Sequence, residues 1–369
     1  MSESPRTLLH VFPSFAVGGA QMRFVQLANQ FGRRYRHVIV SMSGNSEAFG
    51  RLSGDLDARL LDVPVERGKT WPNLKTFRRV LKELRPDLLV TSNWGSIEWA
   101  IANWDGLSPH LHMEDGFGPE EVSRQIPRRV WMRRLALRRS TVMLPSRTLH
   151  DIAGRIWRLR KQSLLHIPNG VDCERFGIGA NPEFAASMGL GGAEPVIGTV
   201  AALRAEKNVT RLLEAFAEVV RRRPARLAVV GDGPELPALR NRADELHIAS
   251  QVTFTGACLE PEKLLPSFTV FALSSNTEQM PLSVLEAMAA GLPLAATDVG
   301  DVRHMVSEEN RPFVVTATVP ALAKAILALL DNPERARAIG EANARRARTG
   351  FDQSLMFAAY RDLFDGGGR

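Results

Sequence analysis

Apolar positions along the chain follow two alternating patterns. Short apolar runs predict β-strands, and longer segments in which apolar residues recur at helical spacing predict helices. In the first half, strands are predicted at 6–15, 36–42 and 87–92, and helices at 16–32 and 73–86. Because strands and helices alternate, we expect right-handed βαβ units and a parallel sheet.

The same alternation restarts in the second half. Strands are predicted at 195–203, 225–233, 252–256, 268–273 and 293–298, and helices at 207–224, 234–247 and 281–291. The segment 177–194 between the two series is rich in Gly, Ala and Pro, which is typical of a linker.

We therefore expect an α/β fold of two Rossmann-like, doubly wound domains that face each other across a cleft. The first domain is assigned to 1–187 and the second to 188–349, and a C-terminal helix in 350–369 is expected to pack back on the first. Open parallel sheets bind ligands beyond the carboxyl ends of their strands. Two such sheets on one cleft predict two substrates that meet between the domains.

Composition indicates a globular protein of a reducing compartment. Hydrophobic residues make up 44% of the chain and charged residues 24%, which is ordinary for a globular protein. Cys173 and Cys258 are too few for a disulfide framework, and no Cys/His spacing resembles a zinc site. Neither a signal peptide nor a membrane-spanning apolar stretch is visible, so a cytoplasmic location is expected.

One segment carries the basic excess of the chain. Residues 124–161 hold 12 Lys and Arg against 1 Asp, whereas the net charge of the whole chain is +7. Basic segments that contain Trp, here Trp131, can lie on anionic bilayers, so one hypothesis is peripheral docking on the inner face of the cytoplasmic membrane. The alternatives are binding of an anionic polysaccharide, or a solvated helix face whose apolar residues belong to the core. Nucleic acid is not an expected partner, because no aromatic residues are interleaved on a sheet as in RNA readers.

Two acids flank the helix predicted at 281–291. Pro281 suits the first helical position, so the amides of 280–283 would lie unpaired at the positive end of the helix dipole and would bind an anion such as a diphosphate. Glu278, just upstream, would accept hydrogen bonds from hydroxyls on the group that carries the phosphate. Glu286, about one and a half turns into the helix, would accept them from a ribose diol. The alternatives are a simple dipole complement for Glu278 and a salt bridge on a solvated face for Glu286.

Two glycine-containing turns follow predicted strands. Gly18 and Gly19 come after the first strand, where they permit a ligand to approach the backbone ahead of a helix N-terminus. Gly231 lies in VVGDGPE after a strand of the second domain, which is a weak nucleotide-loop signal. Plain strand–helix turns explain both stretches equally well. Neither forms the Gly-x-Gly-x-x-Gly pattern of dehydrogenases.

The stretch TEQMPLSVLEAMAAGLPLAATDVG closely resembles the Glu-x7-Glu signature of family 4 retaining glycosyltransferases of the GT-B fold. Other segments agree with that family in order and spacing, namely VGGAQ, HIPNGVDCERF, EKNVTRLLEAF, VVGDGPE and VTFTG. The resemblance covers nearly the whole chain and is densest from 166 to 302. It implies a GT-B fold and the transfer of a sugar from a nucleotide diphosphate with retention of anomeric configuration.

The resemblance also implies roles for the residues singled out above. Glu278 would hold the hydroxyls of the donor sugar and Glu286 the ribose, while Gly18 and Gly19 would approach the donor phosphates from the first domain. The backbone of four residues would receive the diphosphate: Gln279, Met280, Pro281 and Leu282.

In this family a basic pair on the first βα loop of the second domain neutralises the leaving diphosphate. Lys207 matches the lysine, but Ala202 occupies the position of the arginine. Arg204 lies nearer to the lysine and is the expected substitute. This pair and the helix N-terminus would stabilise the leaving group without a metal ion. The alternative for Lys207 is a solvated loop lysine.

Family members often carry a histidine that lines the cleft after a strand of the first domain. Local alignment places Asp115 at that position, with His112 two or three residues away. Either group is a plausible base when desolvated, so the pair would orient the acceptor hydroxyl or take its proton. The alternative is a surface acidic loop with one satisfied histidine.

The resemblance implies a UDP-linked sugar as donor and a lipid-linked or glycan acceptor in cell-envelope, exopolysaccharide or glycolipid synthesis. Two other functions stay open. A nucleotide-sugar epimerase shares the two-domain shape but lacks the Glu-x7-Glu spacing together with NGVD. A non-catalytic carbohydrate or nucleotide binder is suggested by Ala202 and Asp115.

Overall fold

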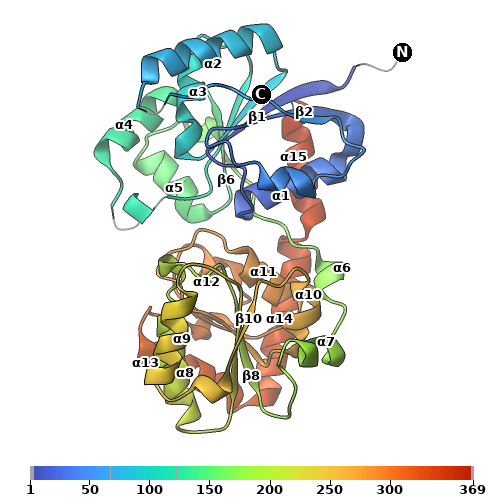
Figure 1. The fold of residues 1–369 in the computed structure, drawn as a ribbon, viewed down its shortest axis with the longest axis vertical. Helices are drawn as coiled ribbons and strands as arrows, with labels where there is room; N and C mark the ends of the chain where they lie inside the picture. Colours follow the sequence, from blue (N-terminus) through green and yellow to red (C-terminus); the bar gives the residue numbers. More distant parts are fainter. Residues whose placement is uncertain (1–3, 67, 118, 122–123, 367–369) are drawn as a thin grey trace. The chain divides into compact units, whose positions relative to one another are not determined.

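The computed structural model describes residues 4–66, 68–117, 119–121 and 124–366 (Figure 1). It divides into two compact units. The first unit is Met1–Pro168 with Met356–Arg369, and the second unit is Asn169–Leu355. Among the described residues, no helix combines the length and the apolar character that crossing a membrane requires.

The first unit is built on a seven-stranded parallel sheet with the order β3-β2-β1-β4-β5-β6-β7. Its strands are β1 (Arg6–Phe12), β2 (Tyr35–Ser41), β3 (Ala58–Leu60), β4 (Leu88–Ser92), β5 (His110–Met113), β6 (Thr141–Leu144) and β7 (Leu164–His166). Its helices are α1 (Gly19–Phe31), α2 (Thr70–Leu84), α3 (Ile97–Ala102), α4 (Pro127–Ala136) and α5 (Arg147–Arg155), joined by α15 (Gln353–Phe364).

The second unit has a six-stranded parallel sheet with the order β10-β9-β8-β11-β12-β13. Its strands are β8 (Val196–Val200), β9 (Arg226–Val230), β10 (Val252–Gly256), β11 (Val270–Leu273), β12 (Leu294–Thr297) and β13 (Val314–Val315). Its helices are α6 (Cys173–Phe176), α7 (Pro182–Ser187), α8 (Val209–Val220), α9 (Leu236–Glu245), α10 (Pro261–Leu264), α11 (Leu282–Ala289), α12 (Val302–Met305), α13 (Val319–Leu330) and α14 (Pro333–Gly350).

The division between the units falls at Pro168/Asn169 rather than at the expected 187/188. The reason is that part of the segment assigned to a linker is folded. It contains α7, and Ala185 and Leu190 are buried in a core cluster of the second unit. Hydrophobic burial therefore draws this stretch into the second unit, although its Gly, Ala and Pro content resembles a linker.

The C-terminal helix α15 packs in the first unit, where Figure 1 shows it beside α1. Tyr360 and Phe364 of α15 are fully buried in one cluster with Leu27 of α1 and Tyr35 of β2. Segments from the two ends of the chain thus form one core.

Each sheet has a point at which the strand order reverses. In the first sheet this point lies between β1 and β4, and in the second it lies between β8 and β11. Crevices outside the carboxyl ends of strands at such a switch point are the usual ligand sites of doubly wound sheets. The loops that follow β8 and β11 are therefore the first place to look for a site in the second unit.

Candidate functional site

The loops after β8 and β11 are tied to one another at the switch point of the second sheet. The amide of Asn276 donates to the Glu206 carbonyl at 2.8 Å, and the Ser274 hydroxyl donates to the Lys207 carbonyl at 3.0 Å. A guanidinium nitrogen of Arg211, on α8, donates to the Ser274 carbonyl at 2.6 Å. These bonds fix the 3-10 turn Ala205–Lys207 against the segment that leads to α11.

Lys207 and Glu278, predicted separately from the sequence, form an ion pair. Lys207 Nζ lies 2.6 Å from Glu278 Oε1, and the Ser275 hydroxyl donates to the same oxygen at 2.7 Å. The Glu278 side chain is 9% exposed and that of Lys207 is 25% exposed. Lys207 is thus not a solvated loop lysine. Ser275 was missed in the sequence, although it lies three residues before Glu278.

The helix after these residues starts one residue later than predicted. Pro281 is the N-cap residue of α11, with extended ψ of 125°, and Leu282 is the first helical residue. Val284 is the first amide to bond back, to the Pro281 carbonyl at 3.2 Å. Within the described residues, the amides of Leu282 and Ser283 have no acceptor. The first turn of α11 therefore has the unpaired amides that suit an anion, at Leu282 and Ser283, whereas Pro281 within the predicted stretch 280–283 has no N–H to offer.

The loop at 278–280 is held in place by its backbone. The Asn169 side-chain amide donates to the Met280 carbonyl at 3.0 Å, and the Asp301 amide donates to the Gln279 carbonyl at 2.9 Å. Gly300 has a φ of +54°, and a Cβ at this position would lie 2.3 Å from the Glu278 carbonyl oxygen. Only glycine permits this approach. The Met280 side chain is buried in the core, so only its backbone is in a position to act in the site.

The glycines of VVGDGPE support the loop that leads to Lys207. Gly231 has a φ of +136°, and a Cβ there would lie 1.9 Å from the Ala201 carbonyl oxygen. A Cβ on Gly233 would lie 2.5 Å from the Leu203 carbonyl oxygen. The local geometry thus explains these glycines by packing of one loop on the next, which is the turn alternative. Arg204 on the supported loop is exposed, and its side chain has no partner among the described residues.

Glu286 lies on α11 and is half-buried. Its carboxylate has no hydrogen bond or ion pair within the part of the chain that the structure describes, so the salt-bridge alternative is not observed. Burial raises the pKa of Glu286 to about 7, an effect that Arg175 counteracts and the nearby Glu262 reinforces. Arg175 is engaged by Glu262 at 2.9 Å. The site therefore contains a carboxylate to which no described residue donates a hydrogen bond.

Gly18 and Gly19 begin α1, after β1 at the switch point of the first sheet. Gly18 is extended, with φ −171°, and its carbonyl accepts from the Met22 amide at 2.8 Å. A Cβ on Gly19 would meet nothing within 4 Å. A Cβ on Gly18 would lie 2.9 Å from Oε1 of the flexible Gln21 side chain. Backbone strain requires glycine at neither position, and only Gly19 has free space beside it.

Asp115 follows β5 and is held by Arg23 of α1. The two side chains pair at 2.5 and 3.0 Å, and the Asp115 amide donates to the Asn93 side chain at 2.7 Å. Arg23 is buried; burial alone would lower its pKa, but Asp115 more than offsets this and the pKa is raised. The Asp115 carboxylate is therefore occupied by an ion pair, which does not fit the predicted role toward an acceptor.

His112 is fully buried within β5. Its Nδ1 lies 2.8 Å from the Thr91 hydroxyl, and its Nε2 lies 3.4 Å from Glu114 Oε2. Glu114 in turn accepts from the buried Arg133 at 3.2 Å. The prediction that His112 handles the acceptor proton does not fit this geometry. The alternative of a satisfied histidine does, although in the core rather than in a surface loop.

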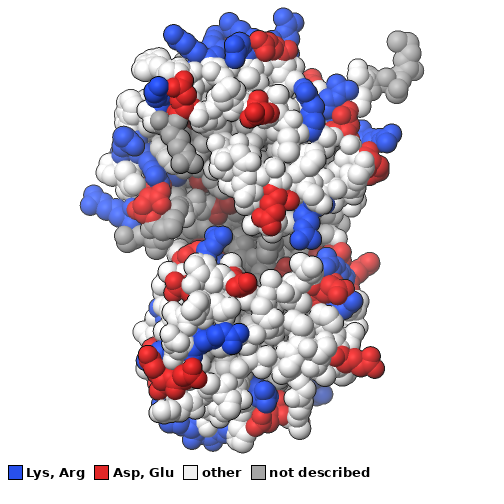
Figure 2. Space-filling view, viewed as in Figure 1, with Lys and Arg blue, Asp and Glu red and all other residues white. Residues whose placement is uncertain are grey.

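Some arginines of the basic segment 124–161 are paired with acids or buried. Arg129 pairs with Glu120 and Glu121 at 2.5 and 3.1 Å, and Arg133 is enclosed in the core. Trp131, in contrast, is 57% exposed. Figure 2 shows Lys and Arg gathered over α2 and along the α4 side of the first unit. Part of the expected basic face is thus neutralised by acids or buried in the core.

Family models match most of the chain in two pieces. The model described as "Glycosyltransferase Family 4" matches residues 17–175, and the model described as "Glycosyl transferases group 1" matches residues 181–346. The two matches do not overlap, and the gap between them is residues 176–180.

Individual relatives agree with these matches. The chain is 34% identical over 221 residues to a GDP-mannose-dependent alpha-(1-6)-phosphatidylinositol monomannoside mannosyltransferase of Mycolicibacterium smegmatis, covering 55% of this chain and 56% of that protein. It is 32% identical to a D-inositol 3-phosphate glycosyltransferase of Segniliparus rotundus, covering 54% of this chain and 47% of that protein. The chain thus spans about half the length of these two relatives. The solved structure of Anabaena HepE in complex with UDP and glucose superposes with a TM-score of 0.83 at 17% identity, covering 98% of this chain and 99% of that one.

Proposed function

The chain belongs to family 4 of the GT-B glycosyltransferases, and from this membership we propose that it transfers a sugar from a nucleotide-diphosphate donor to a saccharide or lipid-linked acceptor. One observation carries the proposal. Lys207, Glu278 and the unpaired first turn of α11 converge at the switch point of the second sheet. A cation and free backbone amides suit a diphosphate, and an adjacent carboxylate suits sugar hydroxyls.

In the free protein, Lys207 and Glu278 neutralise each other as an ion pair. When a diphosphate binds at the start of α11, Lys207 would turn toward it, and Glu278 would be released to accept hydrogen bonds from the sugar. The developing negative charge on the leaving group would then face a cation and oriented amides, and such stabilisation usually contributes most to lowering the barrier. Arg204, exposed on the same loop, is proposed as the second cation.

We assign the acceptor proton to the leaving phosphate and not to a protein base. Asp115 is engaged by Arg23, and His112 has partners on both ring nitrogens. Attack on the same face as departure would give retention of configuration. NMR of the product anomer tests this, because an inverted product would exclude the mechanism.

Glu286 is proposed to bind the ribose of the donor. A ribose diol supplies two donors to a carboxylate that lacks any in the free protein. UDP is the proposed carrier; the name of one relative specifies GDP-mannose, so the base needs a direct test. Thermal shift with UDP-, GDP- and ADP-sugars compares the donors, since a bound ligand raises stability with its concentration over Kd. A larger shift with GDP than with UDP sugars would overturn the choice of UDP.

Transfer itself is tested with the Glu278→Ala variant and with chelator. We expect release of UDP from the donor to fall in Glu278→Ala and to persist in a Glu341→Ala control, which removes an exposed acid from α14. Activity is proposed to be independent of metal, so EDTA should leave the rate unchanged. An isomerised donor in the absence of acceptor would instead indicate an epimerase, and binding without turnover would indicate a non-catalytic binder.

The acceptor is proposed to be lipid-linked and reached from an anionic membrane surface. Exposed Trp131 and the exposed arginines of 124–161 support peripheral docking of the first unit. Co-sedimentation with vesicles tests this: binding should require anionic lipid and decline with salt. Equal binding to neutral vesicles would contradict the electrostatic form of the proposal.

A further inference from the structure

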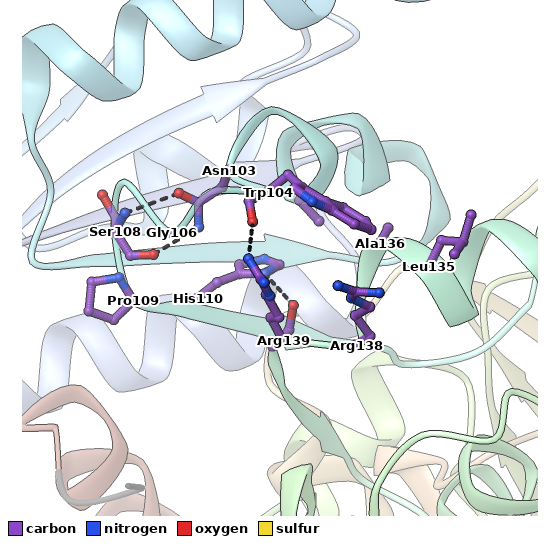
Figure 3. Close-up of a pocket in the computed structure, with 12 residues that line it drawn as sticks. Asn103, Trp104, Gly106, Ser108, Pro109, His110, Leu135, Ala136, Arg138 and Arg139 are labelled. Atoms are coloured by element: carbon purple, nitrogen blue, oxygen red, sulfur yellow. Dashed lines mark hydrogen bonds between the residues drawn. The ribbon is translucent and has the colours of Figure 1, made fainter.

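A second candidate ligand site lies in the first unit and is lined in part by the basic segment 124–161. A cavity of about 420 Å³ opens where the chain enters β5 and β6, between the loop after α3 and the end of α4 (Figure 3). It therefore lies at the amino ends of these strands, whereas Gly18, Gly19 and Asp115 follow the carboxyl ends of strands in the same sheet. Its volume is within the range of small-molecule sites.

Two arginines at this cavity have no acidic partner. Arg138 lies with its guanidinium 4.8 Å from the Trp104 ring centroid, and Arg139 donates to the Trp104 carbonyl at 3.1 Å. No Asp or Glu lines the cavity, and no described residue forms an ion pair with either arginine. Arg129 and Arg133, earlier on α4, are both paired with acids. The cavity thus concentrates positive charge that the protein does not neutralise.

The wall of the cavity also holds an unused hydroxyl. Ser108 is 3% exposed, and its Oγ has no hydrogen-bond partner among the described residues. Its backbone is fixed, because the Asn103 side chain bonds both the Ser108 amide and carbonyl at 3.0 and 2.8 Å. An unpaired buried hydroxyl costs stability unless a ligand or water satisfies it.

The remaining titratable group among the described lining residues, His110, is neutral. Both ring nitrogens of His110 are occupied, by the hydroxyls of Thr91 and Ser140 at 2.8 and 2.7 Å. Burial, assisted by His112, lowers the pKa of His110 to about 3. The charge of the cavity is therefore that of the two arginines across the physiological range.

We propose that this cavity binds a phosphate ester, the group shared by soluble sugar phosphates and phospholipid headgroups. Guanidinium groups match phosphate oxygens in pairs, and the Ser108 hydroxyl, on the side of the cavity opposite Arg138 in Figure 3, would donate to another oxygen of the ester. The site needs no residue of the second unit, so it is independent of the proposed sugar transfer.

Binding is measured by calorimetry with glycerol 3-phosphate and by sedimentation with phosphatidylglycerol in phosphatidylcholine vesicles. The test variant is Arg138→Gln/Arg139→Gln. The matched control is Arg59→Gln/Arg79→Gln, which removes the same charge from exposed positions of the first unit outside the basic segment 124–161. Ser108→Ala removes the hydroxyl without changing charge. Thermal unfolding confirms that each variant is folded.

We expect saturable binding that the Arg138/Arg139 double variant weakens by about tenfold or more, Ser108→Ala by less, and the control hardly at all. A pocket-dependent effect with vesicles alone would identify the lipid headgroup as the source. Equal weakening by both double variants would show a diffuse charge effect and overturn the proposal. Binding that survives in the Arg138/Arg139 variant, or no binding of either probe, would overturn it as well.

Discussion

Replacing Glu286 with glutamine should stabilise the second unit at neutral and alkaline pH. The ordinary pKa of a glutamate is 4.5, and burial raises that of Glu286 to about 7 in the folded protein. A carboxyl whose folded-state pKa is raised holds its proton more tightly when folded. Its ionisation therefore costs nothing below pH 4.5, costs progressively more between pH 4.5 and 7, and reaches a constant penalty above pH 7.

The size of this penalty follows from the shift. Each pKa unit corresponds to about 1.4 kcal/mol, so the full shift corresponds to at most about 3.5 kcal/mol, and the partial exposure of the side chain reduces this. Glutamine keeps the shape of the side chain and cannot ionise. We expect Glu286→Gln to match the wild type at pH 4.5 and to exceed its stability by about 2–3 kcal/mol at pH 8.

Urea unfolding at the two pH values, followed with a probe in the second unit, measures the difference. Glu341→Gln, at an exposed position on α14, removes the same charge and should show no such pH-dependent gain. The same Glu286→Gln variant should bind UDP more weakly, because an amide accepts only at its one oxygen. The reasoning fails if Glu286→Gln is no more stable than the wild type at pH 8, or if it gains equally at both pH values.

Three further substitutions test the contacts described above. Lys207→Met should lower kcat by about 100-fold or more in a donor-turnover assay, since it removes a charged donor from the leaving group, whereas Lys324→Met at an exposed position of α13 should not. Thr91→Val should lower the free energy of unfolding by about 2–4 kcal/mol in denaturant titration, because the hydroxyl serves both His110 and His112, and Thr91→Ser should restore most of it. Asp115→Asn should destabilise the first unit by about 3 kcal/mol by leaving Arg23 buried without its carboxylate; lost activity at unchanged stability would instead indicate a direct role toward the acceptor.

The sequence correctly predicted that Lys207 and Glu278 lie close together, because the order of the strands determines where each of them falls. Lys207 follows β8, and Glu278 follows β11. Alternation of strands and helices places both loops at the carboxyl edge of one sheet, so their proximity is a consequence of topology. The family fold was predictable for the same reason, and the comparisons confirm it.

The sequence did not predict hydrogen-bond and ion-pair partners that lie far apart along the chain. Asp115 is paired with a residue 92 positions away, and His112 is enclosed by Thr91, 21 positions away. Short-range patterns carry no information on such pairs, so both residues looked available. The predicted start of the helix at Pro281 was wrong by one residue for a local reason. Pro281 has an extended ψ of 125°, so it is the N-cap residue, and the helix starts at Leu282.

The two acids of the signature, eight residues apart, are in different electrostatic environments in the free protein. Glu278 has a cation and a hydroxyl on one oxygen, whereas Glu286 has neither among the described residues, and burial raises its pKa to about 7. Under the proposed function, sugar hydroxyls must therefore compete with Lys207 for Glu278, while ribose hydroxyls meet an acid without a competitor. A diphosphate resolves this competition, because it attracts Lys207 away from Glu278. The sugar site would then form only when the phosphates are in place, which restricts Glu278 to sugars that arrive on a diphosphate.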